Sequence, residues 1–239
     1  REEGFSLVRL APLSGGKSAL ILGMPFALWR AYPEDVARVS AFYFTMQRAY
    51  QAEKRLAARL GISTDSHLPR KAYGALGGLG ILGSNGLLHT EKGCAVALSL
   101  LMLEGTTPRT APAAAPSCNG CGACARVCPT CALDGQGHLD PSLCLRAHMI
   151  SGQLIPEPLR RAMGTRLIGC DECMTACATT PIEPADETAL RPFAWDILLS
   201  PPRLKQALPA IGALIGTNYA RQTRLLAQAA LAVGNSGLP

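Results

Sequence analysis

Residues 118–129 read CNGCGACARVCP, and this stretch decides the fold of the segment around it. Its cysteines have the spacing C-x2-C-x2-C-x3-C with a following proline, which is the bacterial ferredoxin run whose fourth thiolate serves the other cluster. The two-residue gaps let three sulfurs of one loop converge on a cube, and the longer step points the last sulfur away. The run therefore predicts ligands for 4Fe-4S clusters.

A second group of cysteines lies downstream. Cys170, Cys173 and Cys177 have the spacing C-x2-C-x3-C, which lacks the first cysteine of a full run, and Cys144 is available to take its place. Exchange of the last thiolate between the two runs then predicts two sets of four ligands. The sets are Cys118, Cys121, Cys124 and Cys177, and Cys128, Cys144, Cys170 and Cys173.

Zinc sites and disulfides are the alternative uses of these cysteines. Zinc prefers two separated C-x2-C pairs to a four-cysteine run with a trailing proline. Cysteines bunched at ligand spacing in a chain of 239 residues favour metal in a reducing compartment over a disulfide scaffold. Two cysteines are left over. Cys94 is expected to pack as a small apolar residue in a strand, and Cys131 to lie in the loop after the first run.

The composition is that of a globular protein. The chain is 48% hydrophobic and 17% charged, which argues against disorder. The longest apolar run, residues 95–103, falls short of the roughly 20 residues that cross a bilayer, and we find no secretion signal. We therefore predict a soluble, cytoplasmic protein. Its net charge of +6 favours anionic partners such as nucleic acid.

The region before the cysteines predicts two buried strands and a long helix. Residues 17–24 (KSALILGM) and residues 94–103 have the apolar character of buried strands. Between them, Pro33 is predicted to open a helix that has two acidic residues in its first turn and ends at Gly61. The order strand, helix, strand suggests an α/β layer.

The segment at residues 105–117 is rich in Pro, Ala and Thr and is predicted to be a linker. It divides the chain into an α/β domain at 1–104, a cysteine-bearing module at 118–185 and a helical segment at 186–239. Residues 74–86 contain six glycines, which form either a site where the backbone approaches a ligand or a plain glycine-rich turn.

Several segments resemble the epoxyqueuosine reductases. CNGCGACARVCPTCAL and IPEPLRRAMGTRLIGCDEC look like the ferredoxin module of that family. TDSHLPRKAYGALGGLGILGSNGLL is similar to its glycine-rich cobalamin-domain segment, and ARQTRLLAQAALAVGNSG to its post-cluster helix. The resemblance implies an α+β protein, in which a cobalamin-type, nitroreductase-like α/β domain precedes a two-cluster ferredoxin-like module and a helical tail.

The resemblance also implies an oxidoreductase that reduces epoxyqueuosine to queuosine in tRNA with cobalamin and two 4Fe-4S clusters. Its partners would be tRNA and an electron donor such as a flavodoxin or ferredoxin, and we expect a monomer without membrane contact. Asp65 has the position of the family's proton donor, although capping a helix near His67 is an alternative role. The residues expected near cobalamin are Gly78, Gly80, Gly83 and Asn85.

The chain departs from the family pattern at residues 45–51 (TMQRAYQ), at Ile81 and Ser84, and at Ala178. Two other functions therefore stay open: a non-catalytic ferredoxin-like electron carrier without the corrinoid, and a corrinoid-dependent reductase of another substrate. The four histidines show no ligand spacing and are expected to be surface or structural. Seven basic residues form either a solvated face or a surface for tRNA phosphates: Arg160, Arg161, Arg166, Arg203, Lys205, Arg221 and Arg224.

Overall fold

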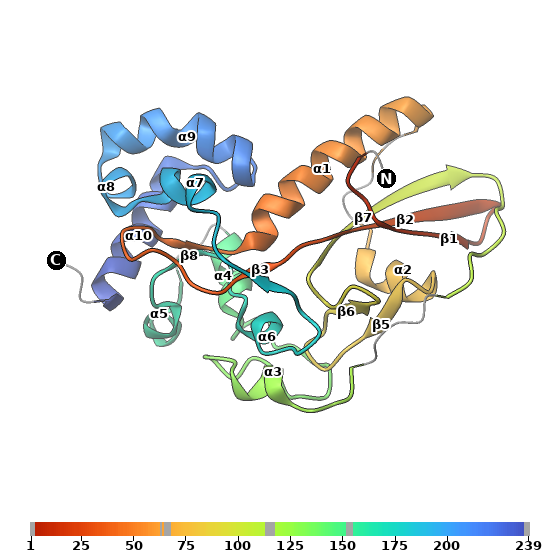
Figure 1. The fold of residues 1–239 in the computed structure, drawn as a ribbon, viewed down its shortest axis with the longest axis horizontal. Coiled ribbons are helices and arrows are strands. Elements are labelled where there is room, and N and C mark those ends of the chain that lie inside the picture. The colour runs from red at the N-terminus through yellow and green to blue at the C-terminus, as the bar shows by residue number, and fades with distance from the viewer. Residues whose placement is uncertain (1–2, 63, 65–67, 113–117, 152–154, 237–239) are drawn as a thin grey trace.

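The computed structural model describes residues 3–62, 64, 68–112, 118–151 and 155–236. A small sheet lies at one end of the molecule and the C-terminal helices lie at the other, with the cysteine-bearing segment between them (Figure 1). None of the helices within these ranges combines the length and hydropathy of a bilayer-spanning segment.

The sheet has three antiparallel strands in the order β1, β2, β7. The strands predicted at residues 17–24 and 94–103 are confirmed as β2 and β7, which pair along their whole length. β1 was not predicted, and it joins β2 through a turn in which Gly15 and Gly16 both have positive φ. The bounds are β1 (Leu7–Pro12), β2 (Lys17–Pro25) and β7 (Val96–Glu104).

The long helix α1 (Ala41–Leu60) packs on β7. Ala49, Ala52 and Ala57 are buried against Leu101 in an apolar cluster, because small side chains let the helix lie close to the sheet. The predicted end of the helix is confirmed. Gly61 has the left-handed φ of +66°, and its amide bonds back to the last turn.

The predicted start of this helix at Pro33 is wrong. Ser40 is the N-cap, and its hydroxyl accepts a backbone amide of the first turn. The preceding residues bond to distant segments: the Ala37 amide donates to the Phe193 carbonyl at 2.9 Å, and the Ser40 amide to the Ile168 carbonyl at 3.0 Å. Because these amides are satisfied outside the helix, the helix does not begin until after Ser40.

The glycine-rich segment forms a short helix and a hairpin below the sheet. Its elements are α2 (Arg70–Leu76), β5 (Gly80–Leu82) and β6 (Leu88–Thr90). Gly80 pairs with Thr90 in this hairpin, and a Cβ at Gly80 would lie 2.0 Å from the carbonyl oxygen of His89. Glycine is therefore required for the two strands to approach.

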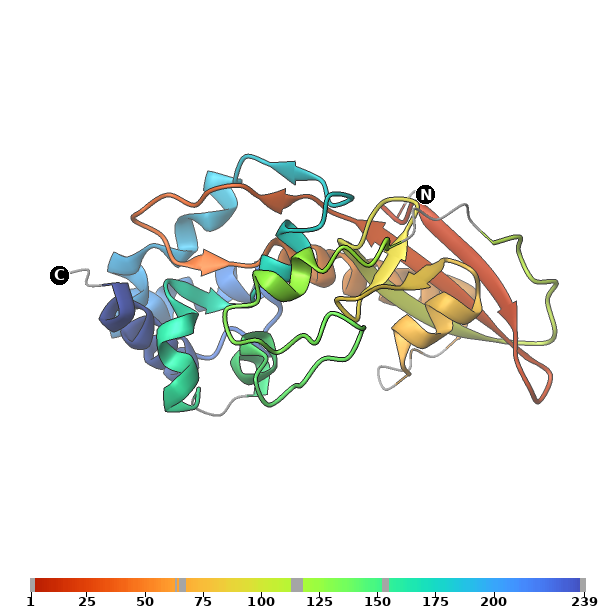
Figure 2. The same cartoon turned by 90° about the horizontal axis from the view of Figure 1, so that it is seen from below.

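The cysteine-bearing segment consists of short elements that are tied to the N-terminal part by two parallel strand pairs (Figure 2). β3 (Leu28–Trp29) pairs with β9, and β4 (Arg38–Val39) pairs with β8. The segment before α1 therefore pairs with two strands from the second half of the chain. The elements of the segment are α3 (Ala123–Arg126), α4 (Leu145–Ser151), α5 (Glu157–Met163), β8 (Arg166–Ile168), α6 (Glu172–Thr175) and β9 (Ile182–Glu183).

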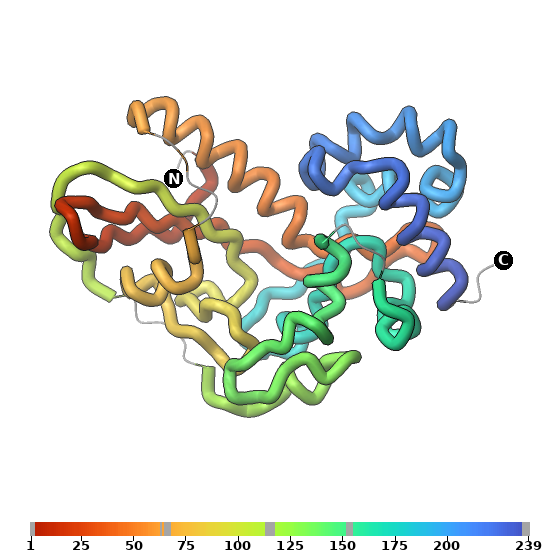
Figure 3. The backbone as a smooth tube through the Cα atoms, turned by 180° about the vertical axis from the view of Figure 1, so that it is seen from behind, coloured from red at the N-terminus to blue at the C-terminus, as the bar shows by residue number. Residues whose placement is uncertain are grey.

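The C-terminal segment is helical, as predicted, and Figure 3 shows it from behind. It packs on the start of α1, where Tyr43 and Phe44 share one buried cluster with Phe193 and Leu225. The fold is thus mixed α+β, with the expected strand–helix–strand layer built on an antiparallel sheet. The helices are α7 (Glu187–Leu190), η1 (Arg191–Phe193), α8 (Trp195–Leu198), α9 (Pro201–Ile215) and α10 (Gln222–Ser236).

Candidate cluster site and adjoining cavity

Three thiols of the first run come from one loop that leads into α3. Gly120 and Gly122 have positive φ values of 68° and 70° and turn the backbone between the cysteines. Burial raises the pKa of the Cys124 thiol, and the nearby Cys118 and Cys121 raise it further. The loop therefore gathers three thiols in one place, as a cubic cluster requires.

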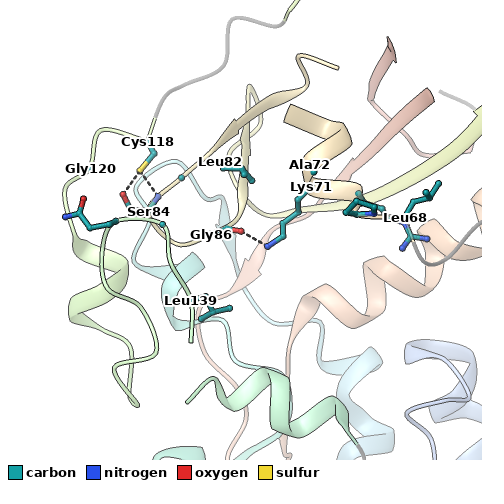
Figure 4. A pocket seen from close by; sticks show the side chains of 14 residues that line it. Leu68, Lys71, Ala72, Leu82, Ser84, Gly86, Cys118, Gly120 and Leu139 are labelled. Carbon is teal, nitrogen blue, oxygen red and sulfur yellow. Dashed lines mark hydrogen bonds between the residues drawn. The ribbon is translucent and has the colours of Figure 1, made fainter. Parts of the chain in front are cut away.

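Ser84 holds Cys118 from the glycine-rich segment. Its amide donates to the sulfur of Cys118 at 3.3 Å, and its hydroxyl lies 3.4 Å from the same sulfur (Figure 4). These hydrogen bonds lower the pKa of the Cys118 thiol. A lowered pKa favours the thiolate, which is the form that binds metal.

Cys177 reaches the same region from the second run. A nitrogen of His89 and the sulfurs of Cys94 and Cys177 lie within 4.8 Å of one another. On the other side of His89, a Cβ added to Gly83 would lie 2.4 Å from Nε2 of His89 and 3.1 Å from Cβ of Cys118. Cys118 and Cys177 therefore both lie beside His89, as expected if exchange places them on one cluster.

The four thiols of the other set line one large cavity of about 950 Å³. Burial raises the pKa of the Cys173 thiol, and charges of neighbouring cysteines, Cys170 foremost, raise it further. The structure thus brings thiols from the end of the first run and from the second run to one cavity wall. They are Cys128, Cys144, Cys170 and Cys173.

Much of the remaining cavity lining comes from α1, from β7 and from residues 215–219. Phe42, Met46 and Tyr50 supply apolar surface, and Gln47 and Gln51 supply amides. The departure from the family pattern at residues 45–51 thus lies in the cavity wall. A corrin ring is a flat apolar macrocycle edged with amide groups, so a wall that mixes apolar side chains and amides fits it.

Four cations, Lys54, Arg70, Lys71 and Arg146, line the cavity together with the acidic Glu53 and Glu172. The guanidinium of Arg146 lies 4.7 Å from the ring centre of Phe42, and Nζ of Lys71 donates to the Gly86 carbonyl at 2.6 Å. Burial lowers the pKa of Lys71, and Arg146 lowers it further. Among the described residues, Lys71 and Arg146 form no ion pair, whereas Arg70 pairs with Glu53 and Glu172 pairs with Arg38 and Arg166. The four cations outnumber the two carboxylates in the cavity lining.

A smaller cleft of about 810 Å³ opens beside Cys118. In Figure 4, Cys118 and Ser84 lie at one end of it and Leu68 at the other, with Leu82, Lys71 and Leu139 between them. Gly83 and Gly120, which have no side chains, also line it. The cleft therefore gives access to Cys118 from outside.

Of the four residues predicted to lie near cobalamin, two line a cavity and two do not. Asn85 lines the large cavity and Gly83 the smaller cleft. Gly78 and Gly80 line neither, and a Cβ at either would press on backbone, that of Pro112 at 3.0 Å in the case of Gly78. The predicted proton donor Asp65 lies outside the described residues.

Sequence reasoning missed Asp171, which lies next to Cys170. Its carboxylate accepts a hydrogen bond from the Ser40 hydroxyl at 2.6 Å, and burial raises its pKa to about 6. The bond ties the start of α1 to the loop of the second run. The sequence does contain a signal for the Ser40 end of this bond, because a serine before an apolar helix is typical of an N-cap.

Four of the seven predicted phosphate-binding residues make bonds within the fold. One of them, Arg160, donates from Nε to the Ile155 carbonyl at 3.0 Å. Arg166 pairs with Glu172, and Arg203 pairs with Asp196 at 2.7 Å. Arg224 donates to the Met149 carbonyl at 2.8 Å. These bonds show that part of the basic sequence serves the structure.

Of the two cysteines outside the ligand sets, Cys131 lies where the sequence predicts and Cys94 lies close to its predicted place. Cys131 is exposed in the loop after the first run. Cys94 is buried with Phe26 and Met174, just before β7 rather than within it, and burial raises the pKa of its thiol to about 11. His89 is buried too, so it is structural rather than on the surface.

Comparisons with known proteins agree with this picture. Residues 117–180 match the family described as 4Fe-4S double cluster binding domain, so the chain carries two 4Fe-4S clusters. The epoxyqueuosine reductase of Synechococcus sp. strain CC9605 is 31% identical over 131 residues, which cover 52% of this chain and 40% of that protein. The Vibrio cholerae enzyme is 36% identical over 102 residues, covering 42% and 27%. The chain thus matches less than half the length of these relatives.

Solved structures share the fold. The epoxyqueuosine reductase of Streptococcus thermophilus matches with a TM-score of 0.70 at 17% identity, covering 98% of this chain and 78% of that one. The Bacillus subtilis enzyme matches with a TM-score of 0.69 at 19% identity, covering 93% and 66%. In its fold and its double-cluster segment, the chain is thus similar to the epoxyqueuosine reductases.

Proposed function

We propose that the protein is an iron–sulfur oxidoreductase that reduces epoxyqueuosine to queuosine in tRNA, with cobalamin and two 4Fe-4S clusters. One observation supports this most directly. Cys128, Cys144, Cys170 and Cys173, the second ligand set, line the same cavity as the apolar and amide side chains of α1. A cluster held there would adjoin whatever cofactor and substrate the cavity takes.

The residues of the chain would act by binding, orienting and excluding water. When bound, the clusters supply single electrons and cobalamin supplies a strongly reducing cobalt centre. Phe42, Met46 and Tyr50 would cover an apolar ring face, and Gln47 and Gln51 would offer amides at its edge. Arg146 and Lys71 would attract the anionic substrate, because neither forms an ion pair among the described residues.

The proposed partners follow from the two openings. A solved relative is a complex with an epoxyqueuosine-modified tRNA stem loop, and we propose that tRNA approaches the large cavity here. Among the residues that the structure describes, the smaller cleft is lined by Arg70 and Lys71 and by no acidic residue. We therefore assign it to an electron donor with an acidic surface, such as a flavodoxin or ferredoxin. The protein would act as a cytoplasmic monomer, with the domain boundaries predicted above.

Reconstitution tests this proposal. Anaerobic loading with iron and sulfide is expected to give about eight irons per chain, and added cobalamin to remain bound through gel filtration. The loaded protein, supplied with a low-potential reductant, is expected to convert epoxyqueuosine to queuosine in tRNA, measured by mass spectrometry of digested nucleosides. Bound cobalamin without conversion would favour a reductase of another substrate. Eight irons without cobalamin would favour an electron carrier and overturn the proposal.

Replacing Asp65 separates its two proposed roles. If its carboxyl group protonates the departing oxygen, Asp65→Asn lowers the single-turnover rate about 10²–10⁴-fold, the range for losing a general acid. Iron content and cobalamin retention are expected to stay unchanged. A residue that only caps a helix would leave the rate nearly intact, because asparagine caps as well as aspartate does. An unchanged rate would therefore exclude the proton-donor role.

A further inference from the structure

A buried hydrogen-bonded chain of three side chains leads to Cys177. Nε2 of His89 lies 3.0 Å from Oδ1 of Asn85, and Nδ2 of Asn85 donates to the sulfur of Cys94 at 3.7 Å. The sulfur of Cys94 lies within 4.8 Å of that of Cys177. His89, Asn85 and Cys94 are each at most 5% exposed.

The direction of each bond in this chain is determined by its donors. Oδ1 of Asn85 already accepts the amide of Leu87 at 3.1 Å, which orients the side-chain amide group. The oxygen therefore faces His89, so Nε2 of His89 carries the proton and donates. The other end of the Asn85 side chain is the NH₂ group, and it faces Cys94. Cys94 thus receives a hydrogen bond on its sulfur.

Thr180 completes the surroundings of Cys94. Its hydroxyl oxygen lies 3.2 Å from the sulfur of Cys94. When Cys177 is a metal-bound thiolate, it can only accept hydrogen bonds. Asn85 and Thr180 can both donate to the sulfur of Cys94, and its thiol proton is then left to point at Cys177. Thr179, 3.2 Å from the sulfur of Cys177, donates to that sulfur as well.

We propose that the Cys94 thiol, held by Asn85 and Thr180, donates a hydrogen bond to Cys177 and thereby raises the reduction potential of the cluster that Cys177 binds. The inference rests on the proposed ligand set of Cys118, Cys121, Cys124 and Cys177. One-electron reduction adds a negative charge to the cluster and its thiolates. A donor aimed at a ligand sulfur stabilises that charge, and hydrogen bonds to the sulfurs are among the factors that set cluster potentials. Cys94 is a positioning residue here, since it is not a ligand.

The test compares variants by iron content and by EPR-monitored redox titration. Cys94→Ala is expected to keep about eight irons per chain and to shift one of the two midpoint potentials to a lower value. Cys94→Ser, which restores a donor, is expected to return that potential toward the wild-type value. Cys131→Ala is the matched control, because it removes an exposed cysteine outside both ligand sets, and both potentials should stay unchanged.

A measurement on the wild-type protein keeps the inference testable if Cys94→Ala folds poorly. Pulsed EPR of the reduced protein in deuterated buffer should detect an exchangeable deuteron near one cluster, and Cys94→Ser should retain it. Unchanged potentials in Cys94→Ala would overturn the inference while leaving the clusters in place. Loss of about four irons in that variant would show instead that Cys94 is a ligand, which also overturns it. Fewer than eight irons in the wild type would contradict the ligand sets themselves, so the two failures are distinguishable.

Discussion

Cys173→Ala is expected to halve the iron content, from about eight to about four irons per chain, and to abolish reduction of the substrate. Cys173 lines the large cavity together with the other three thiols of its set. Losing one of four thiolates leaves an iron without its protein ligand, so that cluster should not survive purification. The other set does not include Cys173 and should keep its cluster, which iron analysis and the EPR signal of the reduced protein would show.

The exchange between the two runs makes this prediction sharper. Cys128 belongs to the first run by sequence, but it lines the cavity with Cys173. Cys128→Ala is therefore expected to remove the same cluster signal as Cys173→Ala, and Cys177→Ala to remove the other one. Cys131→Ala, three residues further along the chain, should keep about eight irons. If Cys128→Ala and Cys177→Ala removed the same signal, the assignment of ligands to clusters would be wrong.

Gly93→Ala is expected to destabilise the protein by about 3 kcal/mol or more. Gly93 has a φ of +85°, which costs an L-residue roughly 1–2 kcal/mol. A Cβ there would also lie 2.2 Å from the carbonyl oxygen of Thr179, and such overpacking costs about 1–3 kcal/mol. The melting temperature should fall by about 6–12 °C, since 1 kcal/mol corresponds to about 2–4 °C at this chain length.

Gly61→Ala is the matched control for this prediction. Gly61 also has a positive φ, +66°, but a Cβ there would meet no atom within 4 Å. Its cost should be the backbone cost alone, about 1–2 kcal/mol, or about 2–8 °C. Because Thr179 contacts Cys177, Gly93→Ala should also lower the iron retained, whereas Gly61→Ala should not. Equal shifts in the two variants would show that the contact between Gly93 and Thr179 does not carry the effect.

Local sequence pattern was sufficient to predict several elements of this protein. The spacing of the cysteines predicts a double 4Fe-4S cluster segment, because the geometry of a cube restricts how sulfurs from one loop can be spaced, and the family match over residues 117–180 agrees. The apolar runs at residues 17–24 and 94–103 identify β2 and β7, since a buried strand needs apolar side chains. Gly61 identifies the end of α1, because few other residues adopt its left-handed conformation.

Only the tertiary structure decided where α1 begins and what surrounds the thiols. Pro33 is a good local helix start, but the amides that follow it bond to Phe193 and Ile168, which are distant in the sequence. Cys94 has no ligand spacing, and it lies near Cys177 only because segments distant in the sequence pack together. Spacing along the chain determines what one loop can bind. Hydrogen bonds and burial between segments far apart in sequence determine which loops meet. Short-range periodicity does not predict those contacts.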